Sequence, residues 1–139
     1  MLLFKIIGIL GTMIKAKYVD GFVLVVPEKD LVAYKKMAAM GGKMWKKAGA
    51  LDYMECVGDD MHPKMGQEKI SNFPDLVNLK KGELVVFSYI TYKSRKHRDQ
   101  VNAKVMKDME KAYDKHKDQP MPFDMKRMNY GGFTVLVGM

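Results

Sequence analysis

The chain has 139 residues, of which 47% are hydrophobic and 29% are charged, and its formal net charge is +8. This length suits one domain with a substantial core, and the hydrophobic content excludes a disordered chain. Of the 24 basic residues, only Arg95, Arg98 and Arg127 are arginine, the usual residue for bidentate recognition of phosphate or base edges. We therefore interpret the lysine-rich excess as a solvated surface.

A single cysteine, Cys56, excludes an intrachain disulfide, and a reducing cytoplasm is the natural setting for such a chain. We expect Cys56 to be a small buried residue within a strand rather than a nucleophile. One cysteine also offers no metal site of its own.

Residues 1–12 are apolar, but a bilayer span needs about 20 residues, and the segment lacks a basic region and a cleavage site typical of signal peptides. We expect residues 1–12 to be an extension outside the core and residues 13–139 to form one domain without a membrane partner. A short extra strand or a membrane-touching peptide is the alternative for residues 1–12.

The first predicted elements are a strand and a helix. Residues 18–26 are dense in β-branched and aromatic residues, which predicts a strand. Apolar residues then recur at steps of three and four over residues 31–48, which predicts a helix with Gly49 just past its end. Gly41 and Gly42 weaken that helix, so we expect at least one of them to allow close packing on the sheet.

The middle of the chain predicts two more strands. Residues 51–58 alternate as a strand does, and residues 59–82 form a long connection in which we expect a short helical turn over residues 74–79. If the protein has a lid or a specificity element, this connection is the candidate. Residues 83–92 contain neither Gly nor Pro and predict a strand with two apolar faces.

The remaining elements are a helix and a strand. Ser94 is a good N-cap for a helix from residue 95 to about residue 106, with a continuation, a bend or a restart beyond it. Residues 128–137 predict the last strand, in which Gly131 and Gly132 indicate a bulge or a close backbone approach.

The order strand, helix, strand, strand, helix, strand predicts an α+β fold, the ferredoxin-like sandwich with a four-stranded antiparallel sheet and two helices on one face. The first, third and last strands are apolar on both faces. The face without helices would then expose more apolar surface than soluble monomers tolerate. We predict that a second copy covers it, giving a homodimer in which two sheets face each other as a dimeric α/β barrel.

Several sequence blocks resemble the YbaA-like bacterial family of unknown function. They are Tyr18-Val-Asp-Gly-Phe-Val, Tyr53-Met-Glu-Cys-Val-Gly-Asp-Asp, Val86-Phe-Ser-Tyr-Ile-Thr-Tyr-Lys-Ser-Arg and Met121-Pro-Phe-Asp-Met-Lys-Arg-Met-Asn-Tyr-Gly-Gly-Phe. The resemblance spans about residues 15–138 and implies a dimeric α/β-barrel fold, but no activity. Met125 departs from it, because a small residue is expected there.

The same strand and helix order occurs in the RNA-recognition motif, which stacks bases on aromatic residues of its third strand. Residues 83–88 place Glu, Leu, Val and Ser where that pattern requires glycine and aromatic residues. A sheet face closed by a second subunit would also be hidden from bases. RNA binding is therefore the weakest function hypothesis, and we expect no nucleic-acid partner.

The motifs of metal and cofactor sites are missing from the sequence. His62, His97 and His116 have no ligand spacing, and neither a phosphate loop nor a dinucleotide fingerprint occurs. We therefore expect no metal and no cofactor.

The dimeric α/β-barrel superfamily includes cofactor-independent monooxygenases that act on aromatic substrates, and this analogy suggests a pocket between the first helix and the sheet. Its candidate residues are Tyr34, Trp45, Tyr53, Phe87, Arg98, Arg127 and Tyr130. An arginine could hold an anionic oxygen there, and Tyr130 could donate a hydrogen bond. Alternatively, Tyr34 and Trp45 are simply core residues, and Arg127, within Asp124-x-x-Arg127, forms an internal ion pair that orders the loop before the last strand.

Two function hypotheses remain open. The first is a dimer that binds a small ligand between helix and sheet without catalysis. The second is a small oxygenase or isomerase that acts on an aromatic or otherwise conjugated substrate. A buried polar pocket in which arginine and tyrosine converge favours the second hypothesis, and a dry, filled core favours the first.

Overall fold

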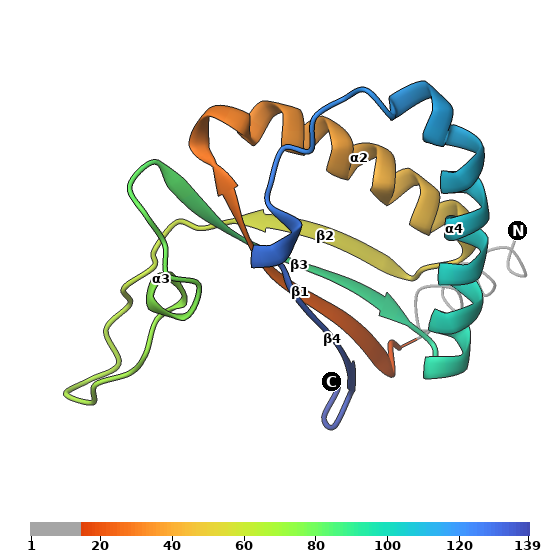
Figure 1. Ribbon diagram of the computed structural model, residues 1–139. Helices are drawn as coiled ribbons and strands as arrows, with labels where there is room; N and C mark the ends of the chain where they lie inside the picture. The colour runs from red at the N-terminus through yellow and green to blue at the C-terminus, as the bar shows by residue number, and fades with distance from the viewer. Residues whose placement is uncertain (1–14) are drawn as a thin grey trace, which may run out of the picture.

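The computed structural model describes residues 15–139, so the predicted extension 1–12 lies outside the described residues. Six main elements follow one another as β1 (Tyr18–Pro27), α2 (Leu31–Ala48), β2 (Asp52–Val57), β3 (Glu83–Tyr92), α4 (Arg95–His116) and β4 (Asn129–Thr134), with the short helical segments η1 (Glu28–Asp30), α3 (Phe73–Leu76) and η2 (Met125–Arg127) between them (Figure 1). The strands form one antiparallel sheet in the order β2-β3-β1-β4. The ferredoxin-like fold class is confirmed.

The element boundaries largely agree with the predictions. β3 spans the predicted residues, and α3 provides the helical turn expected in the long connection. α4 continues past residue 106 to His116 without a restart, whereas β4 ends at Thr134, earlier than predicted. The pairing of β1 with β4 is continuous across Gly131 and Gly132, so no bulge occurs there.

Both long helices lie on one face of the sheet (Figure 1). Val101 and Val105 of α4 are fully buried on one helical stripe, and Leu24, Val26 and Val86 meet α2 from the sheet. Each such burial removes apolar surface from water and stabilises the fold by roughly 1.5 to 3 kcal/mol. No helix within residues 15–139 has both the length and the apolarity needed to cross a membrane.

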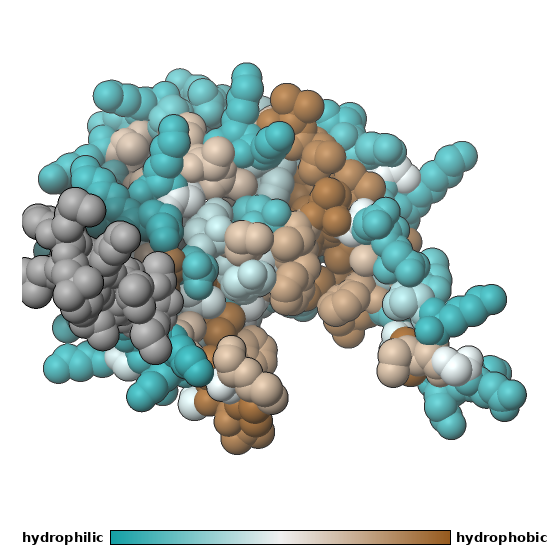
Figure 2. All heavy atoms as spheres, turned by 180° about the vertical axis from the view of Figure 1, so that it is seen from behind, coloured by the Kyte–Doolittle hydropathy of each residue, from teal (hydrophilic) through white to brown (hydrophobic). Residues whose placement is uncertain are grey.

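Within residues 15–139, the opposite face of the sheet is covered mainly at one end. Val77, which follows α3, packs there on Val25 and Val85. The rest of that face exposes large side chains, with Phe87 at 43% and Phe133 at 60% exposure. Seen from behind in Figure 2, hydrophobic atoms also gather at the lower end of the molecule, where the segment after β4 hangs below the sheet in Figure 1. The dimer that would cover this surface stays a prediction.

The expectation of a buried Cys56 is wrong, because this side chain is exposed. β2 is an edge strand of the sheet, and Cys56 pairs with Phe87 of β3 on the face that the helices do not cover. An alternating pattern predicts a strand but does not say whether the strand lies at the centre or at the edge of the sheet.

Candidate functional site: a cavity between the helices and the sheet

A cavity of about 410 Å³ lies between the two long helices and the sheet. Its floor includes Asp20 and Phe22 of β1 and Ser88 of β3, which project to the helix side because alternate residues of a strand share one face. Ala38 and Gly41 of α2 lie above this floor. The small side chains at Ser88, Ala38 and Gly41 leave the space that larger residues would fill.

One wall of the cavity is rich in methionine. α2, α4 and the segment that leads into β4 supply its members, which are Met37, Met106, Met109, Met121, Met125 and Met128. Methionine is unbranched and polarisable, so it packs against differently shaped partners. Six of the 14 methionines of the chain therefore share one location, a concentration that the sequence alone left unexplained.

Asp20 is the most deeply buried acid on the cavity floor, with 1% of its surface exposed. The Nε atom of Arg98 lies 3.2 Å from its Oδ1 atom, yet the two are not aligned for a hydrogen bond. Arg98 instead donates from Nη2 to the Tyr18 hydroxyl at 3.0 Å and from Nη1 to Asp99 at 2.9 Å. Asp20 thus has a nearby positive charge but keeps one oxygen atom without a donor in the described part of the chain.

Burial sets the protonation of this cluster. Loss of solvation raises the pKa of Asp20, and this effect outweighs the attraction of Arg98 and the hydrogen bonds of Tyr130 and Tyr92, which lower it. Burial also raises the pKa of Tyr92 and of Tyr130, and the negative charge of Asp20 adds to both shifts. The two tyrosines therefore keep their hydroxyl protons, and Tyr130, which lines the cavity, can serve as a hydrogen-bond donor there.

Trp45 and Asn102 extend the polar cluster towards the helices. The Trp45 indole donates to Asn102 Oδ1 at 3.1 Å, and the Tyr92 hydroxyl lies 3.4 Å from the same oxygen. Tyr130 stacks on Phe22, with ring centroids 4.7 Å apart. This end of the cavity therefore combines aromatic rings with hydrogen-bonding groups.

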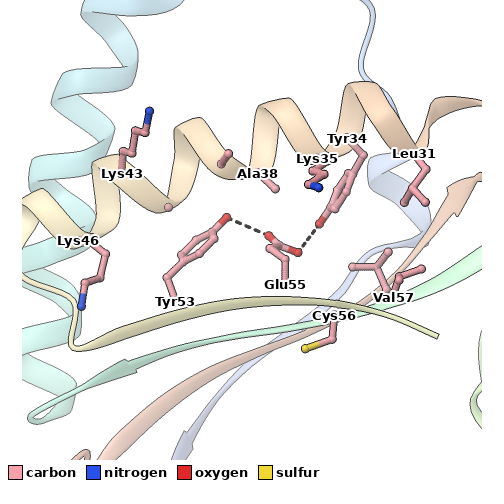
Figure 3. A pocket seen from close by; sticks show the side chains of 13 residues that line it. Leu31, Tyr34, Lys35, Ala38, Lys43, Lys46, Tyr53, Glu55, Cys56 and Val57 are labelled. Atoms are coloured by element: carbon pink, nitrogen blue, oxygen red, sulfur yellow. Dashed lines mark hydrogen bonds between the residues drawn. The ribbon is translucent and has the colours of Figure 1, made fainter. Parts of the chain in front are cut away.

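A second acid, Glu55 of β2, is fully occupied by tyrosine donors. Tyr34 donates to Glu55 Oε2 at 2.7 Å and Tyr53 donates to Oε1 at 2.9 Å (Figure 3). Burial, together with Glu55, raises the pKa of both hydroxyls. Tyr53 fits under α2 because Gly42 has no side chain; a Cβ atom there would lie 2.9 Å from the Tyr53 ring. The predicted close packing at the glycine pair is confirmed.

The three residues Tyr34, Glu55 and Tyr53, here called the tyrosine bridge, separate the inner cavity from an outer groove of about 710 Å³ between α2 and β2. All three line both spaces. The lysines Lys35, Lys43 and Lys46 line the groove (Figure 3). The bridge closes the inner cavity on the side of β2.

Four of the predicted site residues line the inner cavity, namely Tyr34, Trp45, Tyr53 and Tyr130. Arg98 does not line it but lies against Asp20, which does. Of the seven predicted residues, these five therefore belong to one region of the molecule.

The two other predicted residues lie elsewhere. Phe87 projects from the opposite face of the sheet and packs near Phe73 and Tyr89. Its neighbours in β3, Val86 and Ser88, take the helix side instead. Because both faces of β3 are apolar, the sequence could not tell which set faces the helices.

Arg127 is a structural residue in this fold. It pairs with Glu83 and donates to the carbonyl oxygens of Val77 and Asn78, both at 3.1 Å. The guanidinium therefore ties η2 to the end of the long connection. Arg127 thus forms an internal ion pair, as the alternative expected, but its partner is Glu83 and not Asp124, whose side chain accepts from the Lys126 backbone instead.

Asp20, Glu55, Ser88 and Asn102 were not among the predicted site residues. The strongest missed signal is Asp20, an acid within the alternating set Tyr18, Asp20, Phe22 of an otherwise apolar strand. Acidic side chains are rarely buried, because the loss of their hydration is costly unless a partner compensates for it, so an acid in such a strand indicates a special role. Among residues 15–139, no group of three or more His, Cys, Asp or Glu side chains could hold a metal ion.

The fold and the cavity define the class: a ferredoxin-like α+β protein with an apolar cavity and buried polar groups between its helices and its sheet. The family described as "Protein of unknown function (DUF1428)" matches residues 17–125. The chain is 41% identical over 121 residues to "Uncharacterized protein YbaA" of Escherichia coli strain K12. The aligned region covers 87% of this chain and 97% of that protein. The protein of the same name from Shigella flexneri has the same identity and coverage. The chain therefore belongs to the DUF1428 family, which confirms the YbaA-like resemblance.

Proposed function

We propose that this protein binds a small, largely apolar ligand in the inner cavity between the helices and the sheet. The cavity itself carries the proposal, because its volume of about 410 Å³ falls in the range of about 300 to 1,000 Å³ that small-molecule sites occupy. Its walls are mostly methionine and aromatic side chains, with a few buried polar groups at one end. That composition is typical of a binding site in which apolar contacts supply affinity and polar groups fix orientation.

The lining favours a ligand with a flat, conjugated body and one polar end. The stacked pair Phe22 and Tyr130 and the Trp45 ring offer aromatic contact surface, and the methionine wall adapts to the rest of the body. Asp20, Asn102 and Tyr130 meet the polar end.

Enzymatic use of the same cavity, by a small isomerase or oxygenase, is the second candidate function. The buried carboxylate of Asp20 favours it, because Arg98 and the tyrosine hydroxyls converge on that acid. A core filled with side chains would instead have favoured the first hypothesis, a protein without catalysis.

We also propose that the protein works as a homodimer joined through the face of the sheet without helices. The exposed side chains of Met54, Phe87 and Phe133 lie on that face, and Leu136 and Val137 continue the apolar surface beyond β4. A second copy is the simplest cover, since closed symmetric dimers are the commonest oligomers. The ligand site lies on the other side of the sheet, so dimer formation leaves it intact.

Trp45 is the sole tryptophan of the chain, and it lines the cavity, so its fluorescence reports directly on occupancy. Native mass spectrometry of the protein from cell extract identifies any retained molecule, which is then titrated against Trp45 fluorescence. The buffer is kept reducing, in keeping with the cytoplasmic setting expected for exposed Cys56.

The matched variants are Ser88→Leu and Phe87→Leu, neighbours on opposite faces of β3. Ser88→Leu fills the cavity and should weaken binding by about 5- to 150-fold, since adding a buried side chain to occupied space costs roughly 1 to 3 kcal/mol. Phe87→Leu should leave affinity unchanged. Equal affinities for the two variants, or a cavity that takes up no apolar probe, would contradict the proposed function.

A further inference from the structure

We propose that Asp20 is a catalytic acid–base residue that moves a proton between two carbon atoms of an enolisable, β,γ-unsaturated carbonyl compound held in the inner cavity. This inference deepens the proposed function and rests on it, since the substrate must first enter that cavity. It assigns an isomerase reaction to a site that could otherwise be a passive binding pocket.

The geometry around Asp20 differs from that of a structural ion pair. A buried arginine and carboxylate pair normally satisfies its atoms by parallel hydrogen bonds. Here Asp20 Oδ1 and Arg98 Nε are both buried and 3.2 Å apart, and neither has an aligned hydrogen-bond partner within residues 15–139. The Arg98 donors go instead to Tyr18 and Asp99.

Glu55 provides the internal contrast. It lines the same cavity, but Tyr34 and Tyr53 donate to its two oxygens, one to each. Glu55 is thereby tied to the cavity wall, whereas Asp20 Oδ1 lies beside Arg98 without an aligned hydrogen-bond donor among residues 15–139. Of these two cavity acids, we therefore assign the proton transfer to Asp20.

The reaction can be written without an added oxidant or reductant. Asp20 removes a proton from the carbon next to the carbonyl group, and the electrons of that C–H bond form an enolate whose oxygen accepts a hydrogen bond from Tyr130, which lines the cavity. Asp20, now protonated, returns the proton to the far carbon of the conjugated system while the carbonyl group re-forms. The double bond has then moved, and the protein has returned to its starting state.

The surroundings suit this chemistry. The walls are mostly apolar methionine and aromatic side chains, and fixed donors in such a site stabilise a developing oxyanion more than water does. Burial raises the pKa of Asp20, which makes the carboxylate a stronger base once it is ionised. The charged and titratable groups that face it are Arg98, Asp99, Tyr18, Tyr92 and Tyr130.

The test uses a β,γ-unsaturated cyclohexenone, a small probe whose conversion to the conjugated isomer is followed by ultraviolet absorbance. Wild-type protein should accelerate the conversion, and the rate should rise with pH as Asp20 loses its proton. Asp20→Asn should lower the rate at least about 100-fold, the lower end of the usual contribution of a general base. Asp99→Asn is the matched control, because Asp99 also contacts Arg98 but its side chain is 56% exposed; its limiting rate at high pH should match the wild type.

A second readout separates catalysis from a structural role. Para-nitrophenol resembles an enol, and the amide of Asp20→Asn resembles a protonated carboxyl group, so this variant should bind the phenol as tightly as the wild type or more tightly. A merely structural Asp20 would give a loosened variant with weaker binding. That result, or an Asp20→Asn variant with the wild-type rate, overturns the inference.

The remaining outcomes are also decisive. If the probes quench Trp45 fluorescence but the wild type does not accelerate isomerisation, the catalytic inference is wrong and ligand binding stands. If neither probe quenches it, both proposals fail. If Asp20→Asn does not fold, the wild-type pH profile decides, because a pH-independent rate excludes a carboxylate base.

Discussion

Single residues with small side chains create much of the site. Gly132 of β4 lies directly opposite Asp20 of β1, where any larger residue would press on the groups around that acid. A Cβ atom at Gly132 would lie 2.6 Å from Arg98 Nη2 and closer still to the Tyr18 hydroxyl. The glycine that indicated a close backbone approach in the sequence therefore makes room for the arginine beside Asp20.

We predict that Gly132→Ala destabilises the protein by about 1 to 3 kcal/mol, as overpacking of a filled site usually does. Tyr18 is buried and cannot turn away, and Arg98 can yield only by leaving Asp20. Urea unfolding followed by circular dichroism measures the change. Gly131→Ala is the control, since its added Cβ would meet only Phe133 atoms at 3.5 Å and beyond. Equal losses for the two variants would contradict this account of Gly132.

At the scale of elements, the connection between β2 and β3 is held in place by one arginine from far along the chain. Arg127 of η2 binds Glu83 at the start of β3 and two carbonyl oxygens just after α3. Hydrogen bonds lower the pKa of Glu83, with Arg127 as the main cause, which agrees with a stabilising pair. The connection can then bring Val77 onto the sheet.

Arg127→Met should therefore lower the free energy of unfolding by about 1 to 2 kcal/mol, because a partly exposed set of charge-assisted hydrogen bonds is lost. Hydrogen exchange should also increase in residues 73–79. Lys126→Met serves as the control, since the Lys126 side chain makes none of these contacts. Unchanged exchange in Arg127→Met would show that the connection holds its position without the arginine.

The strands and helices could be predicted because hydrophobic period and caps are local signals. β3 ends where the predicted strand ends, and Ser94 caps α4 by accepting a hydrogen bond from the His97 backbone at 3.0 Å. Pairings between distant residues could not be predicted in this way. Phe87 and Val86 are both apolar, so only the assembled sheet decides that Phe87 faces away from the helices.

The candidate site was predicted in part for the same reason. Tyr34 and Trp45 lie on one helical stripe, so their approach to the sheet follows from the period of α2. Arg127 and Glu83 are 44 residues apart, and no periodic signal connects them. The partners of Asp20 come from β3, β4 and α4, a convergence that only the topology provides.

At the scale of the whole molecule, the two faces of the sheet carry different tasks. The helix side encloses the cavity, and the other side exposes Phe87, Phe133 and neighbouring apolar groups. β3 contributes to both faces, with Ser88 on the cavity floor and Phe87 on the exposed face. A dimer through the exposed face would therefore support the floor of the cavity from below.

We predict that the wild-type protein sediments as a dimer at micromolar concentration and that Phe133→Glu sediments as a monomer, because a buried unpaired charge is costly at an apolar interface. Tyr113→Glu, an equally drastic change on the exposed side of α4, should leave the dimer unchanged. Sedimentation velocity distinguishes these outcomes. A wild type that is monomeric under these conditions would rule out the sheet-to-sheet dimer.

The methionine wall has a chemical consequence of its own. Met106, Met121 and Met125 line the cavity and are also more than half exposed, so these side chains are open to oxidants in solution. Oxidation turns a thioether into a polar, chiral sulfoxide. The oxidised methionine wall would then be polar, and the cavity would bind apolar molecules less well. A reductase that converts the sulfoxide back to the thioether would restore the apolar wall.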